Sequence, residues 1–438
     1  MARLLELIVA IILVAVLAVV VGVLMPSHGH VERSLTLSHD IQHTYDVLNN
    51  FRRFPDYSAL HAYEPNTQFT LSGASYGVGS KVSWEGSDAR VGDGSLEIAA
   101  SDPATREIVW TLENPWKGHD KKFTIDISPS DNQKLVSINM AYDVDYGWNL
   151  VDRYSQLYLH GEPSMFMQYS LADLQTLLAN VPNVSYNSLH PRLVDTPQQP
   201  VLMVSTEAPR TLADIAAATN TALEQIDAAM KRLGVKQTGP RVTITTDWGD
   251  QNYSFDIAVP IDSAVLTIDG KAIDLHNAPK ALSLAEQNLA NAAKPAEAAS
   301  TDKDQAADVG GKFEVDGTLT IDPHVRAALM FGGRALAANI DNDTAALLPL
   351  VRQQLKAYAG THGYAFNEYS NRFYDVLTSG EGANPSDPQS FVVYLPVGSA
   401  PEMTPYQIEN PAPAASASAA ASAASVAAPA TAASASSN

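Results

Sequence analysis

Residues 76–86, "YGVGSKVSWEG", decide between a nucleotide-binding fold and an antiparallel sheet. Two glycines bracket one residue and a serine and a lysine follow, as in a phosphate loop. Such a loop must open a helix, because backbone N–H groups and the helix dipole hold the anion. Here the residues that follow alternate in polarity, with Val82 and Trp84 on one face, as in a strand. The third glycine of a dinucleotide-binding motif is absent, and so is the Gly-Lys-Ser/Thr of a Walker motif. The stretch is therefore predicted to be a turn that enters a strand.

The first folded region, residues 31–182, is predicted to contain a strand, a helix, an antiparallel series of strands and a long closing helix. Ser38 or Asp40 can cap the first helix, and Pro55 ends it. The closing helix carries an apolar stripe at spacings of three and four residues. We expect this stripe to cover the concave face of a curved sheet. Its members are Met167, Leu171, Leu174, Leu178 and Val181.

Three stretches of this region carry a resemblance to a known family. They are "VERSLTLSHDIQHTYDVLNNFRRFPDYSAL" (31–60), "GVGSKVSWEG…GDGSLEI" (77–98) and "GEPSMFMQYSLADLQTLL" (161–178). Together they resemble the START-like superfamily, also called the SRPBCC or polyketide cyclase/dehydrase group. The resemblance implies a helix-grip fold, in which a sheet wraps around a long helix with an apolar cavity between them. Members of the family bind lipids, sterols, polyketides and hormones, and those that are enzymes share no fixed catalytic set, so it assigns no catalytic residue here.

Large apolar or amphipathic side chains on these elements should face such a cavity. Ligand contact explains them as well as core packing does, so both interpretations stay open. The candidates are Trp84, Trp110, Tyr142, Met165 and Tyr169.

The second folded region, residues 200–398, contains an internal repeat. A strand (200–208), a helix (211–235) and two strands are followed by a strand (324–333), a helix (343–364) and two strands. Both halves end in an apolar strand closed by proline, at Pro260 and Pro396. A duplicated unit of this kind packs about a pseudo-twofold axis, and the groove between its halves makes a ligand site.

The stretches "LEQIDAAMKRLGVKQTGPRVTIT" (223–245) and "FVVYLPV" (391–397) resemble the GyrI-like family. That family is the effector-binding domain of AraC-type and MerR-type regulators, which implies small-molecule binding. Its members often place a buried glutamate in the strand after the second helix, to meet cationic drugs. Here that strand reads "NRFYDVL" and departs from the pattern, which puts cation binding in doubt. The candidate ligand-binding residues are Tyr253, Glu368, Phe373, Tyr374 and Asp375.

Residues 7–25 are uncharged and almost wholly apolar, long enough to span a bilayer. We interpret residues 1–25 as an uncleaved anchor, since no small-residue cleavage site follows; a cleaved signal peptide is the alternative. With Arg3 before the span and Arg33 after it, we expect a single-pass protein of a bacterial inner membrane whose bulk is extracytoplasmic. Three further segments are expected to be a linker (183–199), a disordered insertion (276–312) and a disordered Ala/Ser/Pro tail (399–438).

The composition narrows the functional classes. The chain has 28 Lys+Arg against 48 Asp+Glu, a formal net charge of −20, which disfavours nucleic-acid binding. It has no cysteine, which excludes disulfides, thiolate nucleophiles and cysteine-ligated zinc. Two histidine pairs, His39 with His43 and His28 with His30, are interpreted as exposed side chains because no third metal ligand follows either pair. We expect no metal and no cofactor.

The sequence therefore predicts an α+β protein with an N-terminal transmembrane helix, a START-like helix-grip domain and a duplicated β-α-β-β GyrI-like domain. Its predicted function is membrane-anchored binding of small apolar or amphipathic molecules in the two pockets. Two other classes stay open: a hydrolase or cyclase that acts in either pocket, and a structural module of the cell envelope whose pockets are filled by side chains.

Overall fold

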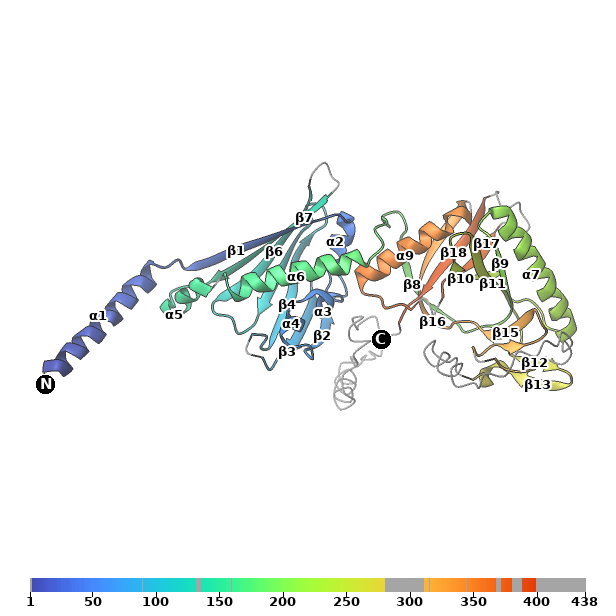
Figure 1. Ribbon diagram of the computed structural model, residues 1–438, viewed down its shortest axis with the longest axis horizontal. Helices are drawn as coiled ribbons and strands as arrows, with labels where there is room; N and C mark the ends of the chain where they lie inside the picture. The colour runs from blue at the N-terminus through green and yellow to red at the C-terminus, as the bar shows by residue number, and fades with distance from the viewer. Residues whose placement is uncertain are drawn as a thin grey trace, which may run out of the picture. The chain divides into compact units, whose positions relative to one another are not determined.

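The computed structural model describes residues 2–88, 90–130, 135–158, 160–279, 311–314, 316–343, 345–367, 372–379 and 388–398 (Figure 1). It is a mixed α+β structure with large antiparallel sheets and one N-terminal apolar helix. The chain divides into two compact units, one of Met1–Asn180 with Thr361–Gly363 and one of Val181–Gly360 with the described residues from Tyr364 onward. The predicted tail, most of the predicted insertion and Glu368 lie outside the described residues.

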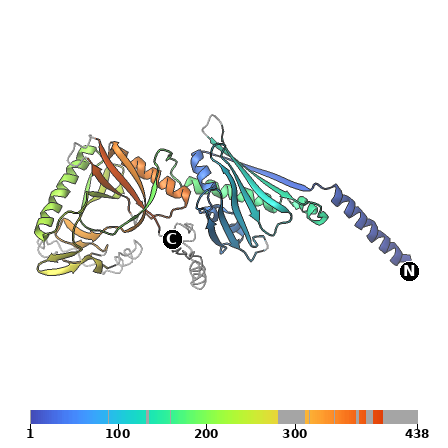
Figure 2. The ribbon, with the colours of Figure 1, turned by 180° about the vertical axis from the view of Figure 1, so that it is seen from behind.

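The first unit holds a seven-stranded antiparallel sheet in the order β1-β7-β6-β5-β4-β3-β2. Figure 1 shows the long helix α6 across one face of this sheet, and the view from behind shows the strands in front of it (Figure 2). The strands are β1 (His28–Leu37), β2 (Gln68–Gly73), β3 (Ser80–Glu85), β4 (Gly94–Asp102), β5 (Glu107–Glu113), β6 (His119–Ser130) and β7 (Leu135–Asp145). The helices are α1 (Ala2–Leu24), α2 (Ile41–Leu48), α3 (Phe54–Tyr57), α4 (Leu60–Tyr63), α5 (Leu150–Arg153), the 3₁₀ helix η1 (Tyr154–Tyr158) and α6 (Glu162–Ala179).

The turn before β3 confirms the prediction for residues 76–86. Gly77 and Gly79 have φ angles of +72° and +84°, which favour glycine, and the strand begins at Ser80. Their N–H groups donate to the carbonyls of Asn49 and Ile98 at 2.8 and 2.9 Å, so the turn binds its own chain. The glycines therefore shape a hairpin.

The helices of this unit follow their local signals except at Pro55, which was wrongly predicted to end the first helix: α2 ends at Leu48, and Pro55 lies in the first turn of α3, a position that tolerates proline. Asp40, and not Ser38, caps α2: its carboxylate accepts from the N–H groups of Gln42 and His43 at 2.7 and 3.3 Å. The predicted stripe on the closing helix is buried, from Met167 to Val181. Its members within α6 share one apolar core with α2, α3 and the inner face of the sheet.

The second unit holds a nine-stranded antiparallel sheet in the order β14-β15-β9-β11-β10-β17-β18-β16-β8. Its strands are β8 (Arg192–Thr196), β9 (Pro200–Pro209), β10 (Val242–Trp248), β11 (Asn252–Pro260), β14 (Leu319–Thr320), β15 (Val325–Leu329), β16 (Gly333–Asp343), β17 (Tyr374–Ser379) and β18 (Gln389–Pro396). The helices are α7 (Leu212–Leu233) and α9 (Leu348–His362), with the short 3₁₀ helices η2 (Leu275–Asn277) and η3 (Ala345–Leu347). A separate hairpin pairs β12 (Val265–Ile268) with β13 (Lys271–Asp274).

The repeat is present as β9-α7-β10-β11 and β16-α9-β17-β18, and β10 pairs with β17 where the halves meet. Two predictions for its strands were wrong. The strand that precedes the second helix is β16, whereas β15, within the predicted 324–333 strand, pairs with β9 of the other half. Residues 192–196, predicted as linker, form β8 and pair with β16. The strand that precedes each repeat therefore pairs with the other half: β8, before the first repeat, pairs with β16, and β15, before the second, pairs with β9.

Candidate functional site

The sheet of the second unit has one face packed on helices and one face that is partly exposed. Along β9, Leu202 and Val204 pack toward α7, so Val201 and Met203 point to the opposite face. Among the described residues, the apolar cluster on that opposite face contains no helical residue. We call this cluster the open face: Val201, Met203, Val242, Ala258 and Tyr374 are its buried members, and Ile244, Ala328, Met330, Phe331, Val376 and Tyr394 its half-buried ones.

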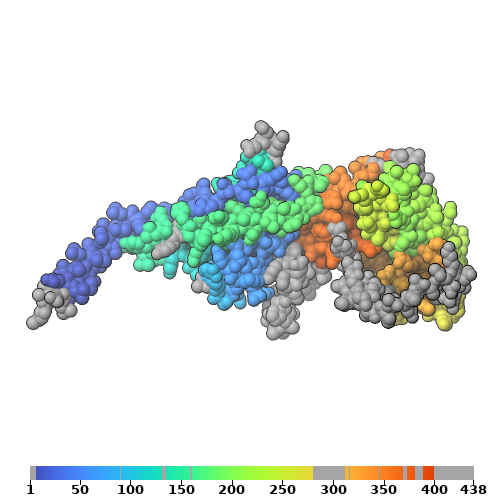
Figure 3. All heavy atoms as spheres, in the orientation of Figure 1, coloured from blue at the N-terminus to red at the C-terminus, as the bar shows by residue number. Residues whose placement is uncertain are grey.

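Figure 3 shows the second unit hollowed beside the residues drawn in orange, which include β15. Two aromatic rings of the open face stack on each other. Tyr374 and Tyr394 are directly opposite on β17 and β18, and their ring centroids are 4.7 Å apart. Burial raises the pKa of Tyr374 to about 12, while the side chain of Thr196 opposes the rise. At neutral pH this buried tyrosine is therefore uncharged.

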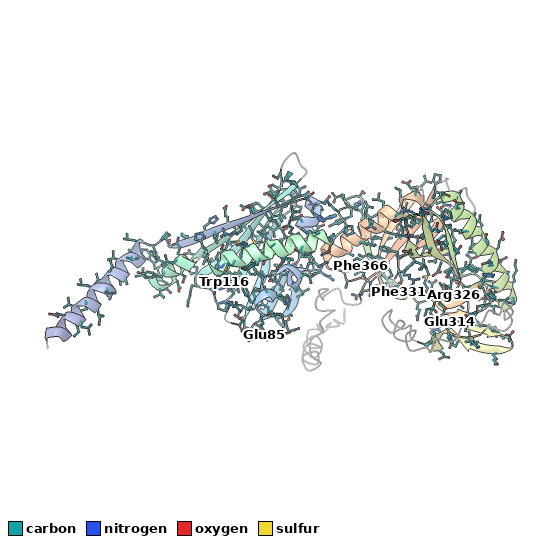
Figure 4. The ribbon with its side chains drawn as sticks, in the orientation of Figure 1. Glu85, Trp116, Glu314, Arg326, Phe331 and Phe366 are labelled. Carbon is teal, nitrogen blue, oxygen red and sulfur yellow. The ribbon has the colours of Figure 1, made fainter. Side chains whose placement is uncertain are left out.

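A buried carboxylate borders the open face. Asp256 on β11 is only 5% exposed and accepts a hydrogen bond from the hydroxyl of Ser205. The guanidinium groups of Arg326 and Arg372 lie 3.8 and 4.0 Å from its oxygens, and Arg326 also pairs with Asp316 at 3.1 Å. Figure 4 labels Arg326 and Phe331, which come from β15 and the segment just after it. An apolar surface with a charge-balanced polar border suits a small amphipathic molecule.

The structure separates the residues predicted for this groove. Tyr374 lies on the open face, but Tyr253, Phe373 and Asp375 lie in the layer that α7 and α9 cover. The reason is the alternation of side chains along a strand, which sends residues adjacent in sequence to opposite faces. Sequence reasoning also missed Asp256. The signal available was an acid inside the apolar run "YSFDIAVPI".

Asp375 pairs with an arginine under α9. The guanidinium of Arg352 donates to its carboxylate and lies 6.0 Å from the ring centroid of Tyr253. Burial raises the pKa of Asp375, and the Arg352 charge opposes that rise. Because Arg352 already neutralises this acid, it leaves no free negative charge to bind a cationic ligand.

In the first unit, three of the predicted cavity residues lie in a packed aromatic interior. Trp84, Trp110 and Tyr142 are each at most 4% exposed. Phe54 is central to the packing, with ring centroids 5.6, 6.1 and 6.4 Å from those of Tyr57, Trp84 and Trp110. Side chains therefore fill the space around Phe54.

The other two predicted cavity residues, Met165 and Tyr169, are 39% and 47% exposed on α6. Each is two positions from Met167, about 200° around a helix, so they lie on the face away from the core. The structure does not bring these two together with the tryptophans.

The aromatic interior keeps polar donors without partners. The indole N–H groups of Trp84 and Trp110 and the hydroxyl of Tyr57 are buried, and none has a hydrogen-bond partner among the described residues. Burial raises the pKa of Tyr57, so its hydroxyl stays protonated. Buried donors of this kind are rare in folded proteins, and an acceptor group on a bound molecule or a water would satisfy them.

On the solvent side of β2, β3 and β4 lies an open cavity of about 730 Å³. It is lined by the charged residues Lys81, Glu85 (labelled in Figure 4) and Asp93 and also by Trp84. A smaller cavity of about 260 Å³ lies between α7, β9 and the region of Arg326 in the second unit. Neither cavity is enclosed by apolar walls, so neither fits an apolar molecule as well as the open face does.

The histidine pairs differ from their prediction in part. His43 is fully buried, and its Nδ1 lies 3.2 Å from Nε2 of His39. Burial and the neighbouring His43 lower the pKa of His39 to about 4. His28 and His30 are exposed as predicted, on β1.

One group in the described part of the chain has the spacing of cation ligands, with atoms within 4.8 Å of one another: His119, Asp120 and Asp145. His119 and Asp120 are exposed and Asp145 is half-buried. Exposed groups of this composition are common without an ion, and the geometry alone assigns them no role.

No protein-family model matches the chain. No curated protein matches it either. Solved structures similar to part of it include the C-terminal domain of EcmrR, at 10% identity and a TM-score of 0.30, covering 49% of this chain and 99% of that one. They also include major latex-like protein 151 from Panax ginseng, at 15% identity and a TM-score of 0.27, covering 35% of this chain and 99% of that one. A norcoclaurine synthase point mutant from Thalictrum, in complex with a transition-state analogue, is 12% identical with a TM-score of 0.28 and covers 35% of this chain and 94% of that one.

Proposed function

We propose that this chain is a membrane-anchored binding protein for small apolar or amphipathic molecules. The observation that carries the proposal is the open face of the second unit, an apolar surface of strand side chains that stays partly exposed beside a buried carboxylate. Contiguous apolar surface of this kind marks a binding site, because leaving it in water costs about 25 cal/mol per Å². The open face is therefore the main ligand site.

The polar border of this face sets the class of ligand. Asp256 and Asp316 balance Arg326 and Arg372, so the border carries no net charge. A neutral or weakly polar head group fits that balance better than a permanent cation does. Asp375, the acid nearest the family's glutamate position, is buried on the opposite layer with Arg352 and supports the same conclusion.

The interior of the first unit is a second candidate, which a ligand would enter only by displacing side chains, because these fill the space around Phe54. Its three unpartnered donors favour an apolar molecule with one acceptor group. This pairing of sites agrees with the START-like and GyrI-like resemblances of the two regions, which we retain as part of the proposal.

Anchoring by α1 is the other half of the proposal. Residues Glu6–Leu24 are long and apolar enough to cross a membrane, a property that a signal sequence shares. We propose that the helix is retained and that the two units lie outside the cytoplasm. N-terminal sequencing of the mature protein tests this, because a chain that begins near Ser27 has lost the anchor.

Photolabelling of the full-length protein in lipid nanodiscs tests the binding site directly. A diazirine-bearing fatty alcohol and a diazirine-bearing fatty acid serve as probes, and mass spectrometry maps the labelled peptides. We expect saturable labelling of β10, β17 and residues 330–331, reduced severalfold by Phe331→Ala and by Val376→Asp. Leu350→Ala, an exposed apolar residue on α9, is the matched control and should label as the wild type does.

The other functional classes give different results. Labelling that unlabelled fatty alcohol cannot compete, or that is confined to α1, contradicts the binding proposal and favours a structural module. A probe recovered with a changed mass would indicate a hydrolase or cyclase.

A further inference from the structure

The residues that follow β7 form an apolar surface beside the N-terminal helix. Trp148, Val151 and Leu157 are 87%, 74% and 67% exposed, although each is large and apolar. They belong to the short segment that contains α5 and η1. We call these three residues the juxtamembrane patch. Isolated apolar residues at a surface are ordinary, but three in one ten-residue segment next to an apolar helix need an explanation.

This segment is bound to the last turns of α1. Arg153 is buried, and its guanidinium donates to the carbonyls of Val23 and Met25 at 3.3 and 3.2 Å. Those carbonyls belong to the end of the helix, where backbone acceptors lack intrahelical partners and the helix dipole favours a cation. Arg153 therefore closes the C-terminal end of α1.

Packing extends the contact further along α1. The side chains of Leu150 and Tyr154 lie against Gly22, where an added Cβ would be 3.3 Å from each. The hydroxyl of Tyr154 donates to the carbonyl of Ala18 at 2.5 Å. Ala18 comes six residues before the end of the helix, about 9 Å along its axis at 1.5 Å per residue. The segment thus lies alongside the last turns of α1 and contacts residues inside the apolar span, not only those at its end.

We infer that α5 and η1 lie in the interfacial layer of the bilayer that holds α1, with the juxtamembrane patch facing lipid. This inference rests on the proposed anchoring by α1. A segment that touches the span at Ala18 and Gly22 sits at the level of the head groups and the first acyl carbons once α1 crosses a membrane. Tryptophan and tyrosine are the residues enriched at that level, because their rings are apolar and their polar atoms stay hydrated.

We expect this contact with the bilayer to depend on apolar side chains and not on charge attraction. The net charge is −20, and Asp152 lies next to Val151 in the same helix. Within α5, however, Arg153 follows Asp152 and offsets its charge, so the segment itself is neutral and the contact should be as strong on phosphatidylcholine as on phosphatidylglycerol and insensitive to salt. A bilayer fits the patch better than a second copy does, because the patch continues from the membrane helix itself.

Because the chain has no cysteine, single labels report on the patch with no background. Val151→Cys and Leu157→Cys, each carrying an NBD fluorophore, are reconstituted as full-length protein into phosphatidylcholine vesicles. Ala104→Cys, in the exposed turn between β4 and β5 at the opposite end of the sheet, is the control. We expect brominated phosphatidylcholine to quench the labels at 151 and 157 severalfold more than the label at 104, and iodide to quench them less.

Each other outcome has a distinct meaning. Labels at 151 and 157 that iodide quenches as freely as the control overturn the inference. Protection from iodide without quenching by bromolipid, varying with the protein-to-lipid ratio, would place a second copy on the patch and also overturns it. Vesicle flotation after an alkaline wash tests the anchor separately: if the protein floats but the labels stay in water, the inference fails and the anchoring stands. If the protein does not float, both fail.

Discussion

The guanidinium of Arg352 donates a hydrogen bond to the carboxylate of Asp375, and the side chains of the two residues are only 7% and 1% exposed. A pair buried this far does not add much stability by itself, since both charges lose their hydration. Breaking it is a different matter, because the remaining charge stays buried without a partner. The pair therefore holds α9 in one position over β17, because any shift that separated the two side chains would leave a buried charge without a partner.

The first prediction follows from this pair. Asp375→Asn should destabilise the second unit by about 3–5 kcal/mol, because it strands the Arg352 charge. The double variant Asp375→Asn/Arg352→Met should recover a large part of that loss. Urea unfolding followed by circular dichroism measures both, and an unchanged midpoint for the single variant would contradict the interpretation.

The cap of α2 gives a second prediction with an internal control. Asp40→Ala should lower the free energy of unfolding of the first unit by about 1 kcal/mol, because two N–H groups lose their acceptor. Ser38→Ala, two residues away and exposed, should change it by less than about 0.5 kcal/mol. Equal losses in the two variants would mean that the helix end is held by other contacts.

The elements that sequence reasoning predicted well are those whose signals are local. The turn at residues 76–86, the cap at Asp40 and the stripe along α6 depend on residues within a few positions of one another. β16 escaped prediction because its sequence, "GRALAANIDND", is rich in alanine and poor in β-branched residues. It is a strand because β18 and β8 pair with it on either side. The pairing of β16 depends on contacts with strands far away in the sequence, and the residues of β16 itself do not predict it.

The candidate site was predictable only in part for the same reason. The sequence groups Phe373, Tyr374 and Asp375 as neighbours, but only the assignment of strand faces separates Tyr374 from the other two. That assignment depends on which side α7 and α9 occupy. Asp256 acquires its meaning from Arg326 and Arg372, which are 70 and 116 residues further along the chain (326 − 256 and 372 − 256).

Gly94 supports a third prediction, about the interior of the first unit. A Cβ at this position would lie 2.5 Å from Cζ2 of Trp84 and 2.9 Å from the carbonyl oxygen of Glu113, so the tryptophan ring needs the glycine. Gly94→Ala should cost about 1–3 kcal/mol through overpacking. Thermal unfolding followed by tryptophan fluorescence measures the loss. Gly239→Ala is the control, since its nearest neighbour would be at an ordinary 3.4 Å, and a loss no larger than that of the control would be evidence against the packing described for Trp84.

His39 gives the fourth prediction, a pH dependence. Its pKa is about 4 in the folded chain against an ordinary 6.5, because burial and the adjacent His43 disfavour the charged ring while Asp40 favours it. The folded state therefore prefers neutral His39, which stabilises it fully above pH 6.5 and progressively less as the pH falls toward 4. His39→Gln should lose less thermal stability than the wild type over that interval. His160→Gln, an exposed histidine of the same unit, should follow the wild type, and parallel curves for all three proteins would contradict the assignment.

The last prediction concerns the exchange of edge strands in the second unit. Asp195 on β8 and Arg334 on β16 are directly opposite and form an ion pair at 3.7 Å, although the sequence between them contains the whole first half of the repeat. Opposite residues of an antiparallel pair have Cα atoms about 4.5–5.5 Å apart, within the range that a disulfide bridges. In a chain without other cysteines, Asp195→Cys/Arg334→Cys should therefore oxidise readily to one intramolecular disulfide and raise the melting temperature. Asp195→Cys/Asn339→Cys is the control, because Asn339 is displaced by five residues along β16, about 17 Å at 3.4 Å per residue. Gel mobility with and without reductant distinguishes the products. If both pairs cross-link equally, or neither does, then β8 does not pair with β16 in this register and the interlocking of the two halves that supports the open face is wrong.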